Sequence, residues 1–250
     1  MKKLTFLFCF LFFVTVTHAQ DNILRADFRQ RPPEMIINGE KKLGPLKDIL
    51  EIAAKRLGYS VKWRNTPFPR SLSDLKDGKI DILPRTVKTQ KREKFVNYLG
   101  PIGYQDKTIL FLVKKGYGDM IQSYEDLKSL KIAVKRKTAY FKRFNEDNNL
   151  DKEESMDDDN MVKMFDRGRF DTMAVLDVAS VELALKKYNI TNYTYAKYKF
   201  SQRNGNYYGM SKNSKHNKLY AKLNEILLNM AKTGEVTKIY KLHGIKPPLQ

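Results

Sequence analysis

A short pattern occurs twice in this chain, at residues 75–83 and again at residues 165–173. Each copy ends a helical segment with a glycine, Gly78 or Gly168, which is followed by a basic residue, an apolar residue, an aspartate and a run with strand character. Glycine at this point allows the left-handed cap from which the chain turns directly into a strand. Two similar helix–strand units predict two similar α/β lobes, and a cleft between lobes is a common place for a small ligand.

Hydrophobic spacing alternates between helical and strand patterns along the chain, which is typical of parallel α/β sheets. A polar stretch with two glycines, 114–124, separates the first set of units from the second. We therefore predict one lobe from 22–113 with 206–250 and an inserted lobe from 114–205. Two linking strands would join them and permit hinge closure. Strands are expected at 22–28, 35–37, 60–64, 79–83, 108–113, 131–134, 170–175, 193–196 and 206–210, and helices at 43–57, 68–77, 90–95, 124–130, 138–145, 178–188, 215–231 and 236–242.

The first residues, 1–19, have the composition of a secretory signal peptide. A basic start is followed by an apolar run, Leu4–Val16, which is too short to span a bilayer, and then by a small residue at Ala19. We expect cleavage after Ala19 and a periplasmic location; an uncleaved anchor is the less favoured alternative because the run is short. The only cysteine, Cys9, lies inside the apolar run, so the mature protein would have no disulfide, thiolate ligand or cysteine nucleophile.

The chain is strongly basic, with a formal net charge of +19. Cleavage would remove two lysines and no acid, which lowers the charge to +17. The lysines are spread along the chain and no nucleic-acid motif accompanies them, so we expect a basic exported surface and no nucleic-acid partner. An acidic stretch, 151–159, lacks the ligand spacing and glycine of a calcium loop, and its last residues suit a helix N-terminus. No metal or cofactor is expected.

Two basic turns are the strongest candidates for a binding site. Thr89 is a natural N-cap, which places Arg92 in the first helical turn, where a cation opposes the helix dipole. Free backbone N–H groups and a guanidinium together suit a carboxylate. Residues 134–139 repeat this arrangement in the second unit, with basic residues before Thr138. Both turns follow strand ends, where open α/β sheets bind their ligands.

The order of these motifs resembles the bacterial extracellular solute-binding proteins of family 3, the polar amino-acid binders of ABC transporters. The resemblance covers about Leu24 to Gly244. It rests on the segments 43–50, 75–83, 89–93, 124–128, 168–177 and 234–240. It implies a two-lobed periplasmic-binding-protein-like fold (type II) that captures a small polar or anionic solute in the cleft, either an amino acid, a dicarboxylate or a short peptide. It also implies an inner-membrane ABC permease as partner, and a monomer.

The resemblance also implies roles for individual residues. Arg92, assisted by Thr89, would hold the α-carboxylate of a ligand, and Asp177 would hold its α-amino group. Thr138 matches the threonine at a helix start in the second lobe. Phe68 matches an aromatic residue of the cleft.

The departures from the family pattern concern charge. Lys137 stands where a glycine usually precedes the threonine of the second lobe. Arg85 precedes the Thr89 turn, Arg70 follows Phe68, and Arg29 and Arg31 lie near the expected mouth. We therefore add Lys137, Arg70 and Arg85 to the expected ligand site. An acidic amino acid, a dicarboxylate or an acidic peptide would suit these cations better than a neutral amino acid.

Two other functions remain open on the sequence. The same cleft could belong to a periplasmic sensor or partner-binding module that serves a receptor instead of a permease. A dehydratase-type enzyme on this fold is less favoured, because the mature chain has only His216 and His243 as histidines, both in the C-terminal helical segment. We expect no enzymatic activity.

Overall fold

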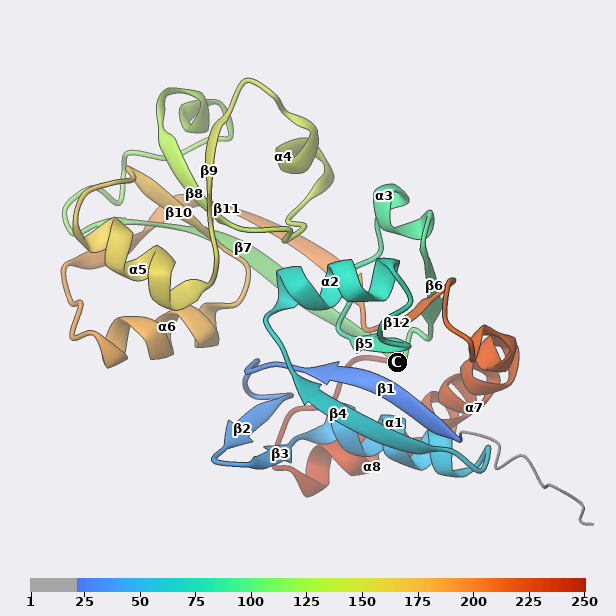
Figure 1. The fold of residues 1–250 in the computed structure, drawn as a ribbon. Coiled ribbons are helices and arrows are strands. Elements are labelled where there is room, and N and C mark those ends of the chain that lie inside the picture. Colours follow the sequence, from blue (N-terminus) through green and yellow to red (C-terminus); the bar gives the residue numbers. More distant parts are fainter. Residues whose placement is uncertain (1–21) are drawn as a thin grey trace, which may run out of the picture.

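The computed structural model describes residues 22–250; the predicted signal peptide, its cleavage point and Cys9 lie outside the described residues. Residues 22–250 form two lobes, each built on a five-stranded sheet (Figure 1). The two-lobed α/β fold predicted from the sequence is confirmed. None of the helices in this part of the chain combines the length and the apolar character needed to cross a bilayer.

The sheet of the first lobe combines two distant parts of the chain. Its strands run in the order β4 (Ser60–Asn65), β1 (Ile23–Phe28), β5 (Ile82–Pro84), β12 (Tyr208–Ser211) and β6 (Val96–Leu99). β1 is parallel to β4 and β5, whereas β12 is antiparallel to both of its neighbours. Because β12 follows the second lobe in the chain, the first lobe contains segments from both before and after that lobe in the sequence.

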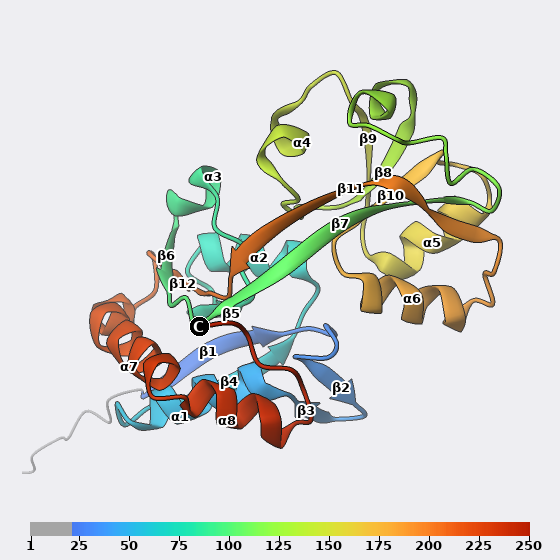
Figure 2. The same cartoon turned by 180° about the vertical axis from the view of Figure 1, so that it is seen from behind.

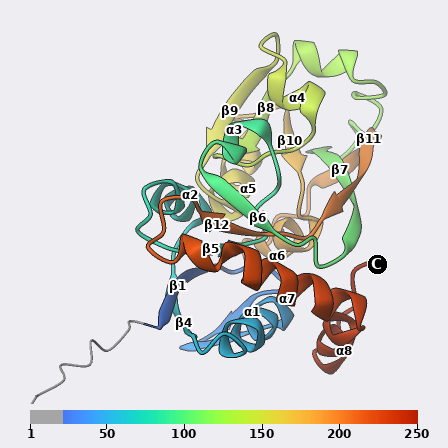
Figure 3. The same ribbon diagram turned by 90° about the vertical axis from the view of Figure 1, so that its right-hand side faces the viewer.

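Helices cover both faces of this sheet. Apolar residues spaced three and four apart in α1 (Pro45–Lys55) give it one buried face. It packs with α7 (Tyr220–Lys232) and α8 (Glu235–Leu242) on the side that faces away from the second lobe (Figure 3). On the other side, α2 (Phe68–Lys76) buries Leu72 and Leu75 in a smaller apolar cluster. The short elements of this lobe are the hairpin β2 (Ile36–Asn38) and β3 (Lys41–Leu43), α3 (Gln90–Glu93) and η2 (Asn217–Leu219).

The sheet of the second lobe has the order β11 (Tyr193–Gly205), β7 (Tyr104–Lys114), β10 (Thr172–Val175), β8 (Lys131–Lys135) and β9 (Asp151–Ser155). β8 is parallel to β9 and β10. One apolar cluster lies under α5 (Asp158–Asp166) and α6 (Val178–Lys187). The other contains buried aromatic rings beside η1 (Glu125–Ser129) and α4 (Lys142–Glu146).

β7 and β11 are the connection between the lobes. They pair antiparallel almost along their whole length and run side by side from one lobe to the other (Figure 2). Near the C-terminus, Leu249 exchanges two backbone hydrogen bonds with Tyr104 at the start of β7, with N···O distances of 2.6 and 2.7 Å. The lobe limits 22–113 with 206–250 and 114–205 stay a prediction; in the strand pairing, β7 belongs to the second sheet from Tyr104 onward.

The repeated pattern has one structural role in both lobes. Its two glycines adopt the left-handed conformation, with φ of 71° and 70°. The Asp81 carboxylate then accepts the backbone N–H of Arg25 at 2.7 Å, and the Asp171 carboxylate accepts that of Lys131 at the same distance. In return, the backbone N–H of Asp81 donates to the carbonyl of Arg25, and the backbone N–H of Asp171 donates to the carbonyl of Lys131. The pattern therefore fastens the start of one strand to its parallel neighbour.

The predicted helix at 138–145 is wrong in its first turn. α4 begins only at Lys142, and Thr138 does not cap it. Lys137 has a left-handed φ of 57°, which interrupts helical geometry, and the adjacent Tyr140 and Phe141 both bury their rings in the aromatic cluster. Strands β6 and β9 were not expected from the sequence.

Candidate ligand-binding cleft

A cavity of about 430 Å³ lies between the two lobes. Most of its walls are formed by residues at or after the carboxyl ends of β1, β4 and β5 in the first lobe and of β8, β9 and β10 in the second. Because the strands in each group are parallel to their neighbours, their carboxyl ends lie at one edge of each sheet, and the two edges face each other. The volume lies in the range of pockets for small ligands.

Arg92 lies at this cleft on the short helix α3. Thr89 is its N-cap as predicted, and the Thr89 hydroxyl oxygen accepts the backbone N–H of Arg92 at 3.3 Å. The Arg92 guanidinium is buried and donates to the carbonyl of Val87 at 2.9 Å. It lies 5.5 Å from the centre of the Phe68 ring at the start of α2. Burial lowers the pKa of Arg92, but a guanidinium stays charged at neutral pH.

A second guanidinium shares the same ring. Arg29 directly follows β1, and its guanidinium carbon lies 4.7 Å from the centre of the Phe68 ring. It donates to the carbonyl of Pro84 at 3.1 Å. Burial and the neighbouring Arg31 lower the pKa of Arg29 to about 9. Among residues 22–250, neither Arg29 nor Arg92 forms an ion pair with a carboxylate.

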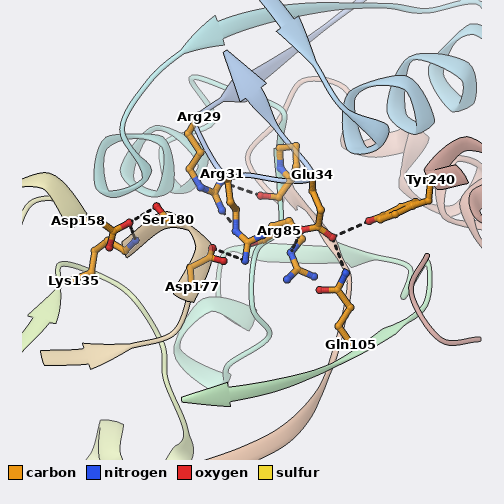
Figure 4. A network of polar contacts seen from close by, with 11 residues as sticks. Arg29, Arg31, Glu34, Arg85, Gln105, Lys135, Asp158, Asp177, Ser180 and Tyr240 are labelled. Carbon is orange, nitrogen blue, oxygen red and sulfur yellow. Dashed lines mark hydrogen bonds and ion pairs between the residues drawn. The ribbon is translucent and has the colours of Figure 1, made fainter. Parts of the chain in front are cut away.

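A network of ion pairs lies beside Arg29 (Figure 4). The buried Glu34 carboxylate pairs with Arg31 at 2.7 Å and with Arg85 at 3.2 Å. It also accepts the hydroxyl of Tyr240 at 2.9 Å and the amide of Gln105 at 2.8 Å. Burial alone would raise the pKa of Glu34, but the Arg85 and Arg31 guanidiniums hold it below its usual value.

The second lobe contributes Asp177, the residue before α6. Its side chain makes no capping hydrogen bond to that helix. Instead, its carboxylate forms an ion pair across the cleft with Arg31 at 3.0 Å. Nearby, Lys135 pairs with Asp158 at 2.6 Å, and Asp158 also accepts the Ser180 hydroxyl at 2.6 Å (Figure 4). Lys107 of β7 also lines the cavity, and burial lowers its pKa.

Further polar contacts bring the lobes together. Arg92 donates to the backbone carbonyl of Lys137 at 2.7 Å, and the Lys137 ammonium donates to the carbonyl of Pro69 at 3.3 Å. The structure therefore shows the lobes in contact across the cavity.

The cavity has more cations than anions. Its basic lining residues are Arg29, Arg31, Arg85, Arg92, Lys107 and Lys135, and its acidic ones are Asp157, Asp158 and Asp177. Glu34, behind Arg31 and Arg85, adds one more negative charge, and the site stays positive. Within residues 22–250, no group of three or more histidine, cysteine or acidic side chains is placed to hold a metal ion.

The expected site residues divide into two groups. Arg92, Asp177, Thr138, Phe68 and Arg85 line the cavity, although Thr138 does so from a turn and not from a helix start.

The other expected residues do not line it. Thr89 acts through the α3 cap, and Lys137 acts through its backbone carbonyl and its contact with Pro69. The structure places Arg70 away from the cavity, with 66% of its side chain exposed and an ion pair to Asp74. Arg70 lies four residues before the buried Asp74 on α2, and its side chain reaches this carboxylate from the solvent side.

Several charged residues at the cleft were not predicted from the sequence as ligand-site residues. Arg29 and Arg31 were expected only near the mouth of the cleft. Lys137 was predicted as a ligand-site residue, but Lys135 was not. Glu34 and Lys107 were not considered as charged groups of the site. Their positions at or shortly after a strand end would have indicated Arg29, Arg31 and Lys135, because ligands of parallel sheets bind there.

Neither histidine of the described part belongs to the cleft. His216 is buried and its ring packs edge-on against Tyr59, with 5.4 Å between ring centres. His243 lies at the end of α8, and its ring nitrogen is 2.7 Å from Asp48. The cleft therefore has no imidazole for acid–base chemistry among residues 22–250.

Comparison with known proteins agrees with this geometry. The sequence model of the bacterial extracellular solute-binding proteins, family 3, matches residues 26–244. A probable histidine-binding protein of Campylobacter jejuni is 32% identical over 88 residues, which are 35% of this chain and 33% of that protein. The matched segment thus spans about a third of the length of that curated relative.

Solved structures share the fold over most of the chain. An ancestral arginine-binding protein bound to arginine is 24% identical, with 88% of this chain and 97% of that chain covered and a TM-score of 0.69. A histidine kinase sensor domain with similarity to periplasmic binding proteins is 18% identical, with 91% and 98% covered and a TM-score of 0.72. At these identities the likeness establishes the two-lobed fold alone.

Proposed function

Since the chain belongs to the bacterial extracellular solute-binding proteins, family 3, we propose that it captures a small anionic solute for uptake by an ABC-type permease. An acidic amino acid, a dicarboxylate or a short acidic peptide is the expected class of ligand. The protein would act in the periplasm after cleavage at Ala19, as a monomer and without catalysis.

One observation carries this proposal. Arg29 and Arg92 both place a guanidinium over the Phe68 ring inside the cavity, and neither has a carboxylate partner among the described residues. Buried cations without counter-charges are costly, and natural proteins retain them where a ligand supplies the charge. A ligand carboxylate beside them would balance this charge and accept charge-assisted hydrogen bonds from the N–H groups that the two guanidiniums do not give to backbone carbonyls.

The charge of the cavity does not favour a cationic ligand. Two of the proteins named above are described as binding histidine or arginine, whereas this cavity has an excess of cations. A ligand with a cationic side chain would add to the repulsion between Arg29, Arg31, Arg85 and Arg92. A ligand with two negative groups would reduce it.

A thermal-shift screen of the purified protein tests the proposal. Succinate, glutarate, aspartate and glutamate should raise the melting temperature, and glutamine, histidine and arginine should have smaller effects or none, because a ligand that binds only the folded state stabilises it by mass action. Affinity for the diacids should fall as salt rises. A preference for glutamine over glutamate would contradict the anionic class.

A sensor role is the second candidate, because a histidine kinase sensor domain shares the fold over 91% of this chain. The two roles predict different results in cells. For a transport protein, deletion of the gene should abolish uptake of the labelled ligand found in the screen. For a sensor module, uptake should persist while the transcriptional response to that ligand is lost.

A further inference from the structure

Arg31 lies between two carboxylates, one from each lobe (Figure 4). One terminal nitrogen is 2.7 Å from Glu34 of the first lobe, and the other is 3.0 Å from Asp177 of the second. Only 12% of the Arg31 side chain and 12% of the Asp177 side chain are exposed. The two ends of the guanidinium fork thus each face a carboxylate.

Arg31 is held in this place from its own lobe. The loop that carries it closes through reciprocal backbone hydrogen bonds between Arg31 and Met35, at 2.8 and 3.0 Å. Its partner Glu34 is in turn fixed by Tyr240, Gln105 and Arg85. Moving Arg31 aside would remove a counter-charge from a buried carboxylate, so the guanidinium is preorganised toward the second lobe.

The negative charge of Asp177 is already paired with a cation, because its Oδ2 lies 3.0 Å from Arg31. Burial alone would raise the pKa of Asp177, but Arg31, Lys107 and Lys135 hold it below its usual value. The carboxylate therefore stays ionised and is surrounded by cations. An ammonium group placed against it would also approach the Arg31 guanidinium, and like charges at such distances repel.

We propose that Arg31 is a specificity-determining residue that occupies the place of a ligand's ammonium group, so that the cleft selects organic dianions without an amino group over α-amino acids. This inference rests on the proposed function and narrows its ligand class. Arg29, Arg92 and Lys107 are the cavity cations that have no ion pair among residues 22–250 and can receive the ligand's negative groups. The preference for a dianion then comes from Arg31, whose charge repels the ammonium group of an α-amino acid.

Calorimetry with glutarate and glutamate tests the proposal, because these probes differ by one ammonium group. The unaltered protein should bind glutarate at least about tenfold more tightly than glutamate, a difference of about 1.4 kcal/mol. Arg31→Met should leave Asp177 without its cationic partner, so that the affinity for glutamate rises. The ratio of glutarate to glutamate affinity should then fall at least about tenfold, or the preference should reverse. Arg70→Met, which removes an exposed cation outside the cavity, should leave the preference unchanged.

A second variant keeps the test decisive should Arg31→Met fold poorly. If Asp177 bound the ammonium group of a ligand, Asp177→Asn would weaken glutamate binding and spare glutarate. The proposal expects no such selective loss, because Asp177 acts on the ligand only through Arg31.

The outcomes separate this inference from the proposed function. Two results would overturn the role of Arg31 and leave an anion-binding protein. The unaltered protein could bind glutamate at least as tightly as glutarate, or Asp177→Asn could selectively lose glutamate binding. Binding of neither probe by the unaltered protein, with glutamate binding gained in Arg31→Met, would support the role of Arg31 and overturn the proposed anionic ligand. Binding of neither probe by any variant would overturn both.

Discussion

The guanidinium of Arg92 in the first lobe donates a 2.7 Å hydrogen bond to the backbone carbonyl of Lys137 in the second. Lys137 itself adopts a left-handed conformation, with φ of 57°. The residue that the sequence assigns to carboxylate binding therefore also contributes to the contact between the lobes. Ligand binding and lobe closure would then depend on one side chain, and a ligand that contacts both lobes would favour the closed state.

Replacement of Arg92 tests its role in binding. Arg92→Met should keep the packing against Phe68 and remove about 2–5 kcal/mol of diacid binding free energy, because a buried charge pair with the ligand is lost. Calorimetry with glutarate would measure the change. Lys91→Met is the matched control, since Lys91 is an exposed cation on the same short helix and its loss should leave the affinity unchanged. An unaltered affinity in Arg92→Met would contradict the assignment.

The backbone of Lys137 should store measurable strain. Lys137→Gly should raise the free energy of unfolding relative to Lys137→Ala by about 1 kcal/mol, because only glycine adopts the left-handed conformation without a Cβ penalty. Both variants lose the contact between the lysine ammonium and Pro69, so their difference isolates the backbone. Urea unfolding would measure it. Equal stability of the two variants would show that the turn relaxes around a side chain.

Arg29 should destabilise the unliganded protein and strengthen its binding of a diacid. In the unliganded protein, Arg29→Met should raise the free energy of unfolding by about 1 kcal/mol or more, because it removes a partly buried cation that repels Arg31 and lacks an acidic partner among the described residues. The same variant should weaken diacid binding. Arg70→Met, on the exposed face of α2, serves as the comparison for both measurements. A loss of stability in Arg29→Met would show that its hydrogen bond to Pro84 outweighs the charge repulsion.

The ion pairs of Glu34 and Asp177 should make the protein sensitive to acid. Both carboxyl groups have pKa values below their usual range in the folded state, so the unfolded chain takes up protons first. Their stabilisation is complete above the usual carboxyl pKa of about 4 and is lost as the pH falls through the lowered values. Urea unfolding should therefore give a smaller free energy at pH 3 than at pH 7. Asp177→Asn should show a smaller loss between these pH values, and an equal loss would assign the effect to other carboxylates.

The local pattern of the chain was sufficient for the elements that depend on short-range rules. The glycine and aspartate of the repeated pattern predicted the turn into a strand in both lobes, because the left-handed cap is a property of glycine itself. The Thr89 cap and the apolar face of α1 were likewise correct. These features need no distant partner to form.

Elements whose partners are distant were missed or misplaced. β9, Asp151–Ser155, is rich in acids and is a strand because it pairs with β8 at the edge of the sheet. β11 runs on to Gly205, well beyond the predicted strand at 193–196, because it pairs along β7 to form the connection between the lobes. The local sequence of β11 carries no information about which distant strand it pairs with.

The sequence by itself determined the two-lobed fold, the capped turn of Arg92 and the surplus of positive charge, since each follows from residue type and spacing. Only the tertiary structure decided which cations enter the cleft. Arg70 and Arg29 are equally basic in the sequence, but the face of α2 turns Arg70 to solvent, and the end of β1 directs Arg29 over Phe68. The pairing of Arg31 with Asp177 joins residues from different lobes, so it exists only because β7 and β11 place those lobes against each other.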